Sequence, residues 1–327
     1  MKGNRIIGTG TGVPSRILTN DDLSKIVDTT DEWIVSRTGI RERRIAADNE
    51  ATSDFSAWAA IEAMKMADVQ PEEIDLIIVA TLTPDRLLPS TACLVQGKID
   101  AKNAFCFDLE AACSGFVYGL AVANGMMPDQ GVKTALVVGA ETLSRVLDWT
   151  DRNTCVLFAD GGGAAIMRHE GGDHGILSTY MKSDGSAPPP WLAVDPGVAD
   201  ISPLGDRVSK NMAITMEGKE VFKFGVRALP DAVLGALAKS EGLTLKDIDW
   251  IIPHQANLRI IDAAAKSLDI PREKFIVNLE KYGNTSAGTI PIALDEANRD
   301  GRIKKGDIVA LSGFGAGLTW GGTIIRW

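Results

Sequence analysis

The stretch PEEIDLIIVA (residues 71–80) has a counterpart of the same pattern in KDIDWIIPH (residues 246–254). Each contains a short apolar run, which is typical of a strand buried under helices on both faces of a sheet. The segments that follow match in the same order: FDLE (107–110) with VNLE (277–280), and TALVVGAE (134–141) with DIVALSGF (307–314). The repeat predicts an α/β protein built by duplication of one unit, although any two βαβ units share part of this pattern.

Amphipathic segments separate the predicted strands. The strand at 74–81 is preceded by a predicted helix with cap residues and one apolar face: Thr52, Ser53 and Asp54, then Phe55, Trp58, Ala59, Ala63 and Met66. Further strands are expected at 104–109 and 134–139, and helices at 113–126 and 229–240. Residues 183–206, rich in Pro, Gly, Ser and Asp, predict a long loop that is either functional or disordered.

Composition excludes several classes of protein. The chain has 327 residues, 45% hydrophobic and 24% charged, which is the balance of a folded globular protein. Its net charge of −9 argues against a nucleic-acid binder that works through bulk positive charge. No apolar run reaches the roughly 18 residues of a membrane span and no secretory signal is visible, so a cytoplasmic protein is expected. Four Cys without a CxxC and only three His predict no disulfide scaffold and no metal site.

The segment EAACSGFVYGL (110–120) contains the strongest candidate nucleophile, Cys113. It follows a predicted strand and opens a predicted helix, where the helix dipole and free N–H groups favour the thiolate. Its small neighbours leave room for a substrate: Ala111, Ala112, Ser114 and Gly115. A buried, inert Cys is the alternative, and it is the preferred interpretation of the other three Cys.

Two more polar residues are expected beside Cys113. His254 directly follows a predicted strand, and Asn284 lies in the small-residue turn GNTSAG (283–288), where it is expected to be the second-half counterpart of Cys113. In α/β sheets, sites gather where the carboxyl ends of strands meet, so the three side chains are predicted to converge. Taken alone, the His has a structural interpretation and the Asn that of a turn former.

At these residues the sequence resembles the condensing enzymes of the thiolase-like superfamily, and closely the β-ketoacyl-acyl-carrier-protein synthase III group. The resemblance covers nearly the whole chain through motifs in fixed order: IIGTGTGVPSRILTNDDL (6–23), TTDEWIVSRTGIRER (29–43), AACSGF (111–116), DRNT (151–154), FADGGGAA (158–165), PHQANLRI (253–260), YGNTSAG (282–288) and GFGAGLTWG (313–321). It implies two thiolase-like halves, 1–172 with the Cys and 173–327 with the His and Asn, in a five-layered αβαβα architecture, and a homodimer.

By that resemblance Cys113, His254 and Asn284 are the catalytic triad of the initiating condensing enzyme of type II fatty acid biosynthesis. Cys113 takes the acyl group of an acyl-CoA, normally acetyl-CoA in this family, and the backbone N–H groups of Cys113 and Ala316 meet the oxyanion. Malonyl on acyl carrier protein then loses CO2, and a neutral His254 and Asn284 donate to the enolate. The implied product is 3-oxoacyl-acyl carrier protein, and coenzyme A enters as a substrate thioester rather than as a cofactor.

Two departures separate the chain from sister families. Thiolases place a second Cys near the C-terminal glycine turn, and GFGAG (313–317) has none. Elongating synthases use two His for decarboxylation, whereas His169 and His174 lie in a polar stretch that predicts a surface loop.

The resemblance also implies substrate contacts. Those for coenzyme A are Trp33 and Arg152 around the adenine, Arg37 and Thr38 nearby, Asn257 on the pantetheine arm, and Gly218 and Phe222 along the tunnel. Leu88 in RLLPS (86–90) corresponds to a residue that reaches the acyl pocket of the partner subunit and is Phe in some acetyl-users. Acetyl-CoA is the expected primer, and the smaller, flexible Leu88 side chain leaves a longer or branched primer as the alternative.

An acidic chain that receives an acidic carrier protein needs a local basic patch. The candidates are Lys219, Lys223 and Arg227 at i, i+4 and i+8, with Arg259 and Lys266 on the helix after His254. An ordinary solvated face is the alternative interpretation of these charges.

Three rival functions remain at this stage. A cysteine hydrolase also uses Cys, His and Asn, although the sequences around Cys113 and His254 do not resemble papain-like ones. A non-catalytic protein that kept the fold would not need the triad. A condensing or acyl-transferring enzyme of a secondary pathway, with a longer or branched primer, would share every motif.

Overall fold

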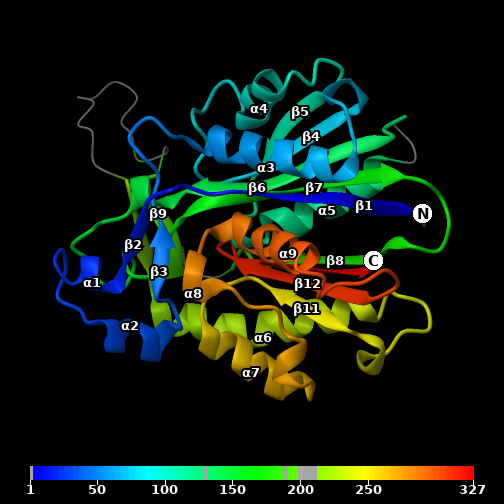
Figure 1. Cartoon of the computed structure of the whole chain (residues 1–327). Coiled ribbons are helices and arrows are strands. Elements are labelled where there is room, and N and C mark those ends of the chain that lie inside the picture. The colour runs from blue at the N-terminus through cyan, green and yellow to red at the C-terminus, as the bar shows by residue number, and fades with distance from the viewer. Residues whose placement is uncertain (1–2, 128–130, 187–190, 198–199, 201–211) are drawn as a thin grey trace.

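Two large sheets form the frame of the molecule in the computed structural model, which describes residues 3–127, 131–186, 191–197, 200 and 212–327 (Figure 1). The first sheet has the order β1 (Asn4–Gly12), β7 (Asp160–His169), β6 (Thr134–Thr142), β4 (Leu76–Ala80) and β5 (Phe105–Leu109). The second has the order β8 (Gly175–Ser183), β13 (Thr319–Arg326), β12 (Ile308–Gly315) and β11 (Trp250–Pro253). Two short pairs are β2 (Ile17–Thr19) with β3 (Glu42–Arg44), and β9 (Leu192–Asp195) with β10 (Ala213–Met216).

The two sheets have matching topology. β4 pairs in parallel with β6, β6 pairs antiparallel with β7, and β7 pairs antiparallel with β1. In the same way, β11 pairs in parallel with β12, β12 pairs antiparallel with β13, and β13 pairs antiparallel with β8. The predicted α/β duplication is therefore confirmed at the level of strand order and direction.

Among the described residues, no strand of the second sheet corresponds to β5 of the first. The segment VNLE, expected to match the strand segment FDLE, instead leads into the short helix α8 (Leu279–Tyr282), and only Phe275 forms an isolated bridge to Ile251. The backbone N–H of Asn278 donates to the side chain of Gln255 rather than to a neighbouring strand. That part of the predicted repeat is wrong, because the side chain of Gln255 accepts the hydrogen bond that a neighbouring strand would accept in a sheet.

The helices complete five layers (Figure 1). α3 (Thr52–Ala67) and α4 (Thr91–Ile99) cover the outer face of the first sheet, and α6 (Gly218–Leu237) and α7 (Leu258–Leu268) cover that of the second. α5 (Gly115–Met126) and α9 (Thr289–Arg299) lie between the sheets and pack against both. The short helices α1 (Asn20–Leu23) and α2 (Asp31–Thr38) lie beside β2 and β3. The αβαβα architecture is confirmed.

Three local expectations change. Trp58 of α3 is 40% exposed, because α3 directs Phe55, Ala59 and Ala63 at the sheet and leaves Trp58 at the rim. α6 begins at Gly218, well before the predicted 229, since Phe224, Gly225 and Ala228 extend its buried face. The loop expected at 183–206 contains β9; residues 187–190, 198–199 and 201–206 lie outside the described residues.

Among the described residues, no helix has both the length and the apolar character that crossing a membrane requires.

Candidate active site

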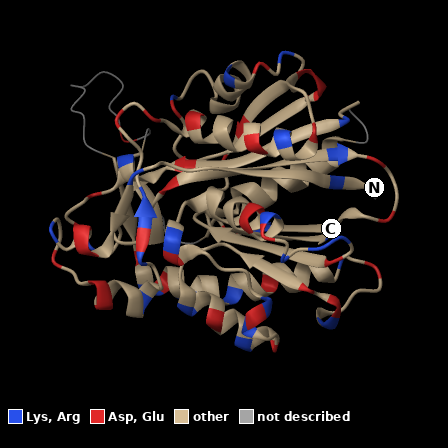
Figure 2. Cartoon of the chain, viewed as in Figure 1, with Lys and Arg blue, Asp and Glu red and all other residues tan. Residues whose placement is uncertain are grey.

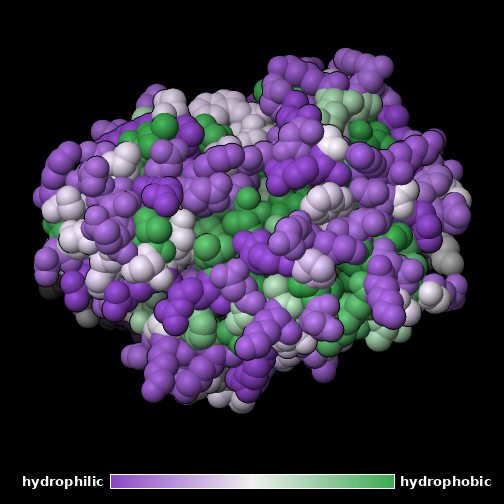
Figure 3. Space-filling model, turned by 60° about the horizontal axis from the view of Figure 1, so that its bottom comes forward, coloured by the Kyte–Doolittle hydropathy of each residue, from purple (hydrophilic) through white to green (hydrophobic). Residues whose placement is uncertain are grey.

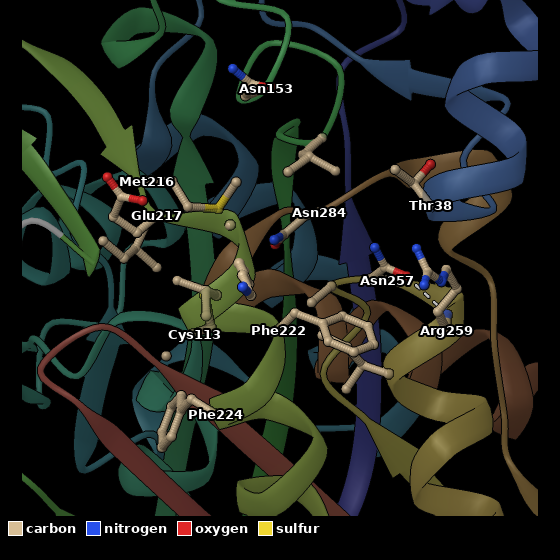
Figure 4. Close-up of a pocket in the computed structure, with 18 of the residues that line it drawn as sticks. Thr38, Cys113, Asn153, Met216, Glu217, Phe222, Phe224, Asn257, Arg259 and Asn284 are labelled. Atoms are coloured by element: carbon tan, nitrogen blue, oxygen red, sulfur yellow. Dashed lines mark hydrogen bonds between the residues drawn. The ribbon is translucent and has the colours of Figure 1, made fainter.

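A cavity of about 780 Å³ brings together the three side chains that the sequence predicted would converge. Cys113, His254 and Asn284 all line it, and residues of both halves form its wall (Figure 4). Cys113 comes from the turn between β5 and α5, His254 from the end of β11, and Asn284 from the turn before α9. The site thus lies at the carboxyl ends of parallel strands, where α/β folds place their ligands.

Cys113 is held on a strained turn. The segment Ala112–Ser114 forms a single 3₁₀ turn before α5, and Ala112 has a φ of 46°, which is unfavourable for a residue with a Cβ. The carboxylate of Glu110 accepts the N–H of Ala112 at 2.8 Å and stabilises this turn. Gly315 passes so close that a Cβ there would lie 2.6 Å from the nitrogen of Cys113. The glycine turn after β12 therefore lies against the backbone of the nucleophile.

Burial controls the sulfur. Cys113 is only 5% exposed, and burial raises the pKa of its thiol to about 12; the nearby Ser286 side chain opposes this rise, while the charges of Glu141 and Glu110 add to it. Burial therefore keeps Cys113 of the free protein as a neutral thiol, so the thiolate expected from the helix N-terminus is wrong. The proton must leave as the sulfur attacks.

His254 is a buried, neutral imidazole. Its backbone N–H donates to Ser312, and Nδ1 lies 2.7 Å from the hydroxyl of Thr289. The rings of His254 and Phe314 pack in a T-shaped arrangement with their centroids 5.2 Å apart. Burial lowers the pKa of His254 to about 3, which confirms the expectation of a neutral ring.

Asn284 is fixed by its own turn. Its Oδ1 accepts the backbone N–H of Ser286 at 2.8 Å, and its backbone bonds to Leu157 and Ala159 on both sides. Because Oδ1 is occupied, the NH2 group is the end of the amide that can serve a ligand in the cavity (Figure 4). The site therefore contains a neutral imidazole and an amide N–H donor near one thiol.

The predicted register of the repeat is wrong by three residues at this point. Ala112–Ser114 corresponds to the 3₁₀ turn Ser286–Gly288, because each turn opens with a positive φ, 46° and 49°, and each precedes a central helix. The counterpart of Cys113 is thus Ala287, and Asn284 lies three residues earlier. The three side chains still come together, because the turn Ser286–Gly288 packs tightly on β6. A Cβ at Gly139 of β6 would lie 2.1 Å from the Ala287 carbonyl oxygen.

Most residues expected to contact coenzyme A line the same cavity: Trp33, Arg37, Thr38, Gly218, Phe222 and Asn257. Arg152 is not among its lining residues, but its guanidinium lies 5.1 Å from the Trp33 ring centre, and that of Arg37 lies 4.5 Å away. The hydroxyl of Thr38 donates to the Ile34 carbonyl instead of facing a ligand. Ala316 follows the lining residue Gly315, whereas Leu88 is 85% exposed and lies outside the cavity.

Sequence reasoning missed part of the wall. Residues to which the sequence analysis gave no role also line the cavity: Asn153, which lies in the DRNT motif, and Leu192, Met216 and Glu217. Leu192 and Met216 pair with each other across β9 and β10, a contact between segments that no local pattern announces. His169 is the last residue of strand β7 and bonds to Asn4, so its predicted place in a surface loop is wrong, and His174 is partly exposed. Neither of them lines this cavity.

Two matching α/β halves with a buried Cys, His and Asn where they meet are the features of a thiolase-like condensing enzyme. The family described as 3-Oxoacyl-[acyl-carrier-protein (ACP)] synthase III matches residues 107–185, and its C-terminal part matches residues 237–327. The chain therefore belongs to the 3-oxoacyl-[acyl-carrier-protein] synthase III family. It is an acyl-transferring condensing enzyme of the kind that initiates fatty acid biosynthesis.

Full-length relatives support this assignment. The chain is 51% identical over 324 residues to beta-ketoacyl-[acyl-carrier-protein] synthase III of Xanthomonas campestris, covering 99% of this chain and 98% of the relative. It is 52% identical over 331 residues to the protein of that name from Clostridium acetobutylicum, covering 100% and 99%. The crystal structure of 3-oxoacyl-[acyl-carrier-protein] synthase III from Aquifex aeolicus matches with a TM-score of 0.92 at 47% identity, covering 99% and 100%.

Proposed function

We propose that the protein condenses an acyl-CoA primer with malonyl-acyl carrier protein through an acyl group on Cys113, giving 3-oxoacyl-acyl carrier protein, coenzyme A and CO2. The observation that carries this proposal is the meeting of Cys113, His254 and Asn284 in one cavity. In the first half-reaction, Sγ of Cys113 attacks the thioester carbon, the bond from that carbon to the coenzyme A sulfur breaks, and coenzyme A leaves as its thiol with the proton that Cys113 gives up. The backbone N–H groups of Cys113 and Ala316 stabilise the oxyanion, supported by the close packing of Gly315 on Cys113.

In the second half-reaction, malonyl-acyl carrier protein loses CO2 and its thioester becomes an enolate. The developing negative charge lies on the thioester oxygen, and His254 and Asn284 are the donors for it. The enolate carbon attacks the acyl carbon, and the Cys113 sulfur leaves as a thiolate that takes a proton from water and returns to the neutral thiol. A neutral His254 suits this role, because it donates a hydrogen bond without giving away its proton.

The experiment that tests this function is a product assay. Purified protein with acetyl-CoA and malonyl-acyl carrier protein should yield 3-oxoacyl-acyl carrier protein, with one CO2 and one coenzyme A for each product. Acetyl-CoA without malonyl-carrier should give no free acid beyond the uncatalysed background. Catalytic release of free acetate would instead support the cysteine hydrolase.

Trp33 is proposed to stack on the adenine of coenzyme A. Its ring lines the cavity, and the guanidinium groups of Arg37 and Arg152 lie over that ring. Replacing Trp33 by Ala should raise KM for acetyl-CoA about 10-fold, the effect of losing one base stack, and leave kcat nearly unchanged. Steady-state kinetics at saturating malonyl-carrier measure both constants. A fall in kcat with KM unchanged would contradict the assignment.

The carrier protein is proposed to dock on α6 and α7, beside the cavity mouth. Lys219, Lys223 and Arg259 line the cavity, and Arg227 and Lys266 lie further along the same two helices. Acidic residues are interspersed with them on these helices (Figure 2), and this face is mostly hydrophilic with small apolar groups between the polar ones (Figure 3). A local basic surface beside the mouth would steer an acidic partner despite the net negative charge.

Changing Lys223 to Glu should raise KM for malonyl-carrier, by about 5-fold for one reversed rim charge, and should spare loading from acetyl-CoA. Lys65→Glu is the matched control. Lys65 also pairs with a glutamate three residues earlier, at 2.7 Å, as Lys223 does at 2.8 Å, but it lies on α3 in the opposite outer layer. An equal KM increase in both variants, or none in Lys223→Glu, would contradict docking at α6.

The chain is proposed to divide into two halves, residues 1–172 and 173–327. This division agrees with the strands, because β1–β7 lie in the first half and β8–β13 in the second. Homodimer formation is proposed because Leu87 and Leu88 are 78% and 85% exposed, as expected of residues that enter a partner subunit. Sedimentation of the full chain tests that state. A cytoplasmic location stays a prediction.

Leu88 is expected to affect which acyl chains the enzyme accepts as primers. If it enters the partner's acyl pocket, isobutyryl-CoA should support turnover within about 10-fold of acetyl-CoA, since one or two methylene groups change pocket binding by about that factor. Octanoyl-CoA extends the comparison to longer chains. Leu88→Phe should lower use of isobutyryl-CoA and spare acetyl-CoA, and an unchanged ratio would remove Leu88 from the pocket.

A further inference from the structure

Thr289 bonds the side of the His254 ring opposite to its proposed substrate contact. Thr289 is the first residue of α9, and its hydroxyl oxygen lies 2.7 Å from Nδ1 of His254. Both side chains are buried, with 2% of each residue exposed. Within the described residues, this is the hydrogen bond that the imidazole makes, so Thr289 fixes the rotation of the ring together with the edge contact to Phe314.

The neutral imidazole carries one proton, and its Nδ1 partner decides which nitrogen bears it. The Thr289 hydroxyl has one proton and two acceptors in reach, Nδ1 at 2.7 Å and the Ser286 carbonyl at 3.0 Å. The Ser286 carbonyl also accepts the backbone N–H of Thr289. If the hydroxyl donates to Nδ1, then Nδ1 and the Ser286 carbonyl each have a donor, and the hydroxyl proton lies in the shorter of the two contacts. The ring proton of His254 then lies on Nε2.

We propose that Thr289 is a positioning residue that holds His254 in the tautomer protonated on Nε2, so that this nitrogen can donate to the enolate of the malonyl thioester. The inference rests on the proposed function and adds to it the location of the proton and the side chain that sets it. Without Thr289, Nδ1 loses its donor, and the ring is free to carry its proton on the wrong nitrogen.

The same short turn then prepares both enolate donors. The backbone N–H of Ser286 holds Oδ1 of Asn284 and so presents the amide NH2, while Thr289, three residues later, holds Nδ1 of His254. Ser286 also adopts a positive φ of 49°, which a residue with a Cβ adopts only under constraint. The segment 284–289 therefore sets the direction of two N–H donors before substrate binds, which is the preorganisation that electrostatic stabilisation requires.

The tautomer can be measured directly. The chain has three His, so protein labelled with ¹⁵N-histidine gives three imidazole systems, and the His254→Ala spectrum assigns the buried one. At pH 7, His254 should show a protonated Nε2 and an unprotonated Nδ1. Thr289→Val should lose this preference and Thr289→Ser should keep it. A wild-type ring protonated on Nδ1 would overturn the proposal without any activity assay.

The half-reactions give a second readout. Thr289→Val should lower the rate constant for malonyl decarboxylation roughly 10- to 100-fold, as loss of a positioning partner does, and leave acyl loading of Cys113 unchanged. Thr289→Ser should restore decarboxylation. Thr285→Val is the matched control. Thr285 lies in the same turn, and its buried hydroxyl has no hydrogen-bond partner among the described residues, so this variant should behave as wild type.

The outcomes separate this inference from the proposed function. Full decarboxylation by Thr289→Val, or a Thr289→Ser variant as impaired as Thr289→Val, overturns the positioning role while the enolate role of His254 stands. Full decarboxylation by His254→Ala overturns the proposed function itself. If Thr289→Val does not fold, the wild-type ¹⁵N spectrum and the Thr289→Ser variant still decide the question.

Discussion

Replacing Cys113 by Ala should abolish acyl loading and lower condensation by at least about 10³-fold, as expected for removal of a covalent nucleophile. Cys113 is the cysteine that lines the cavity with His254 and Asn284, so no other thiol of the described residues is placed to accept the acyl group. Decarboxylation of malonyl-carrier should survive, because its two donors remain. The readouts are product formation from acetyl-CoA and, separately, release of CO2 from malonyl-carrier.

A matched cysteine variant controls for the loss of a thiol. Cys93 is exposed on α4 and does not line the cavity, so Cys93→Ala should load and condense as wild type. Cys113→Ser keeps the shape of the turn but presents a hydroxyl, which is a far weaker nucleophile without a base to activate it. Condensation by Cys113→Ala at near the wild-type rate would refute the acyl-enzyme.

Replacing His254 by Ala should lower decarboxylation and condensation about 10²- to 10³-fold, the effect of losing one preorganised donor to a developing oxyanion. Loading of Cys113 from acetyl-CoA should continue, because His254 is assigned to the second half-reaction. Asn284→Ala should show the same separation. Rapid-quench measurements of acyl loading and of CO2 release resolve the two steps.

The pH dependence checks the state of the ring. Burial lowers the pKa of His254 to about 3, so the imidazole is neutral at every pH well above that value. Decarboxylation should therefore show no inflection from His254 between pH 8 and pH 5, and only acid near pH 3 would charge the ring. An inflection near 6.5 that disappears in His254→Ala would contradict this. His169→Ala, at the exposed end of β7, is the control and should leave both half-reactions intact.

The fold could be predicted from the sequence because strands buried on both faces leave a strong local signal. Residues 71–80 and 246–254 revealed the equivalent strands β4 and β11, and the neighbouring strands β6 and β12 followed in order. Trp58 was misplaced because its neighbours in α3 fill the sheet contact. The VNLE segment was misassigned because the side chain of Gln255 takes the backbone N–H that a strand would offer.

The site was predicted as a set but not in its details. Small residues around Cys113 and the resemblance of whole motifs identified three residues that the fold brings together. Sequence spacing could not show that Ala287, rather than Asn284, corresponds to Cys113, since that depends on which residue of each turn has a positive φ. The protonation of Cys113 was also misjudged, because its depth of burial is a tertiary property.

The role of Thr289 was invisible for a similar reason. Thr289 is 35 residues from His254, and a threonine opening a helix ordinarily serves that helix alone. Only the packing of α9 against the end of β11 brings its hydroxyl to the imidazole. A contact between side chains so far apart in sequence can be found only from the folded structure, whereas a nucleophile on a turn of small residues can be predicted from the sequence.

Intact-protein mass spectrometry, with peptide mapping, tests the central claim most directly. After mixing with acetyl-CoA, the protein should gain one acetyl group, mapped to Cys113, and the adduct should disappear when malonyl-carrier is added. An unmodified protein that still makes the condensation product, or an adduct mapped to another residue, would contradict the account.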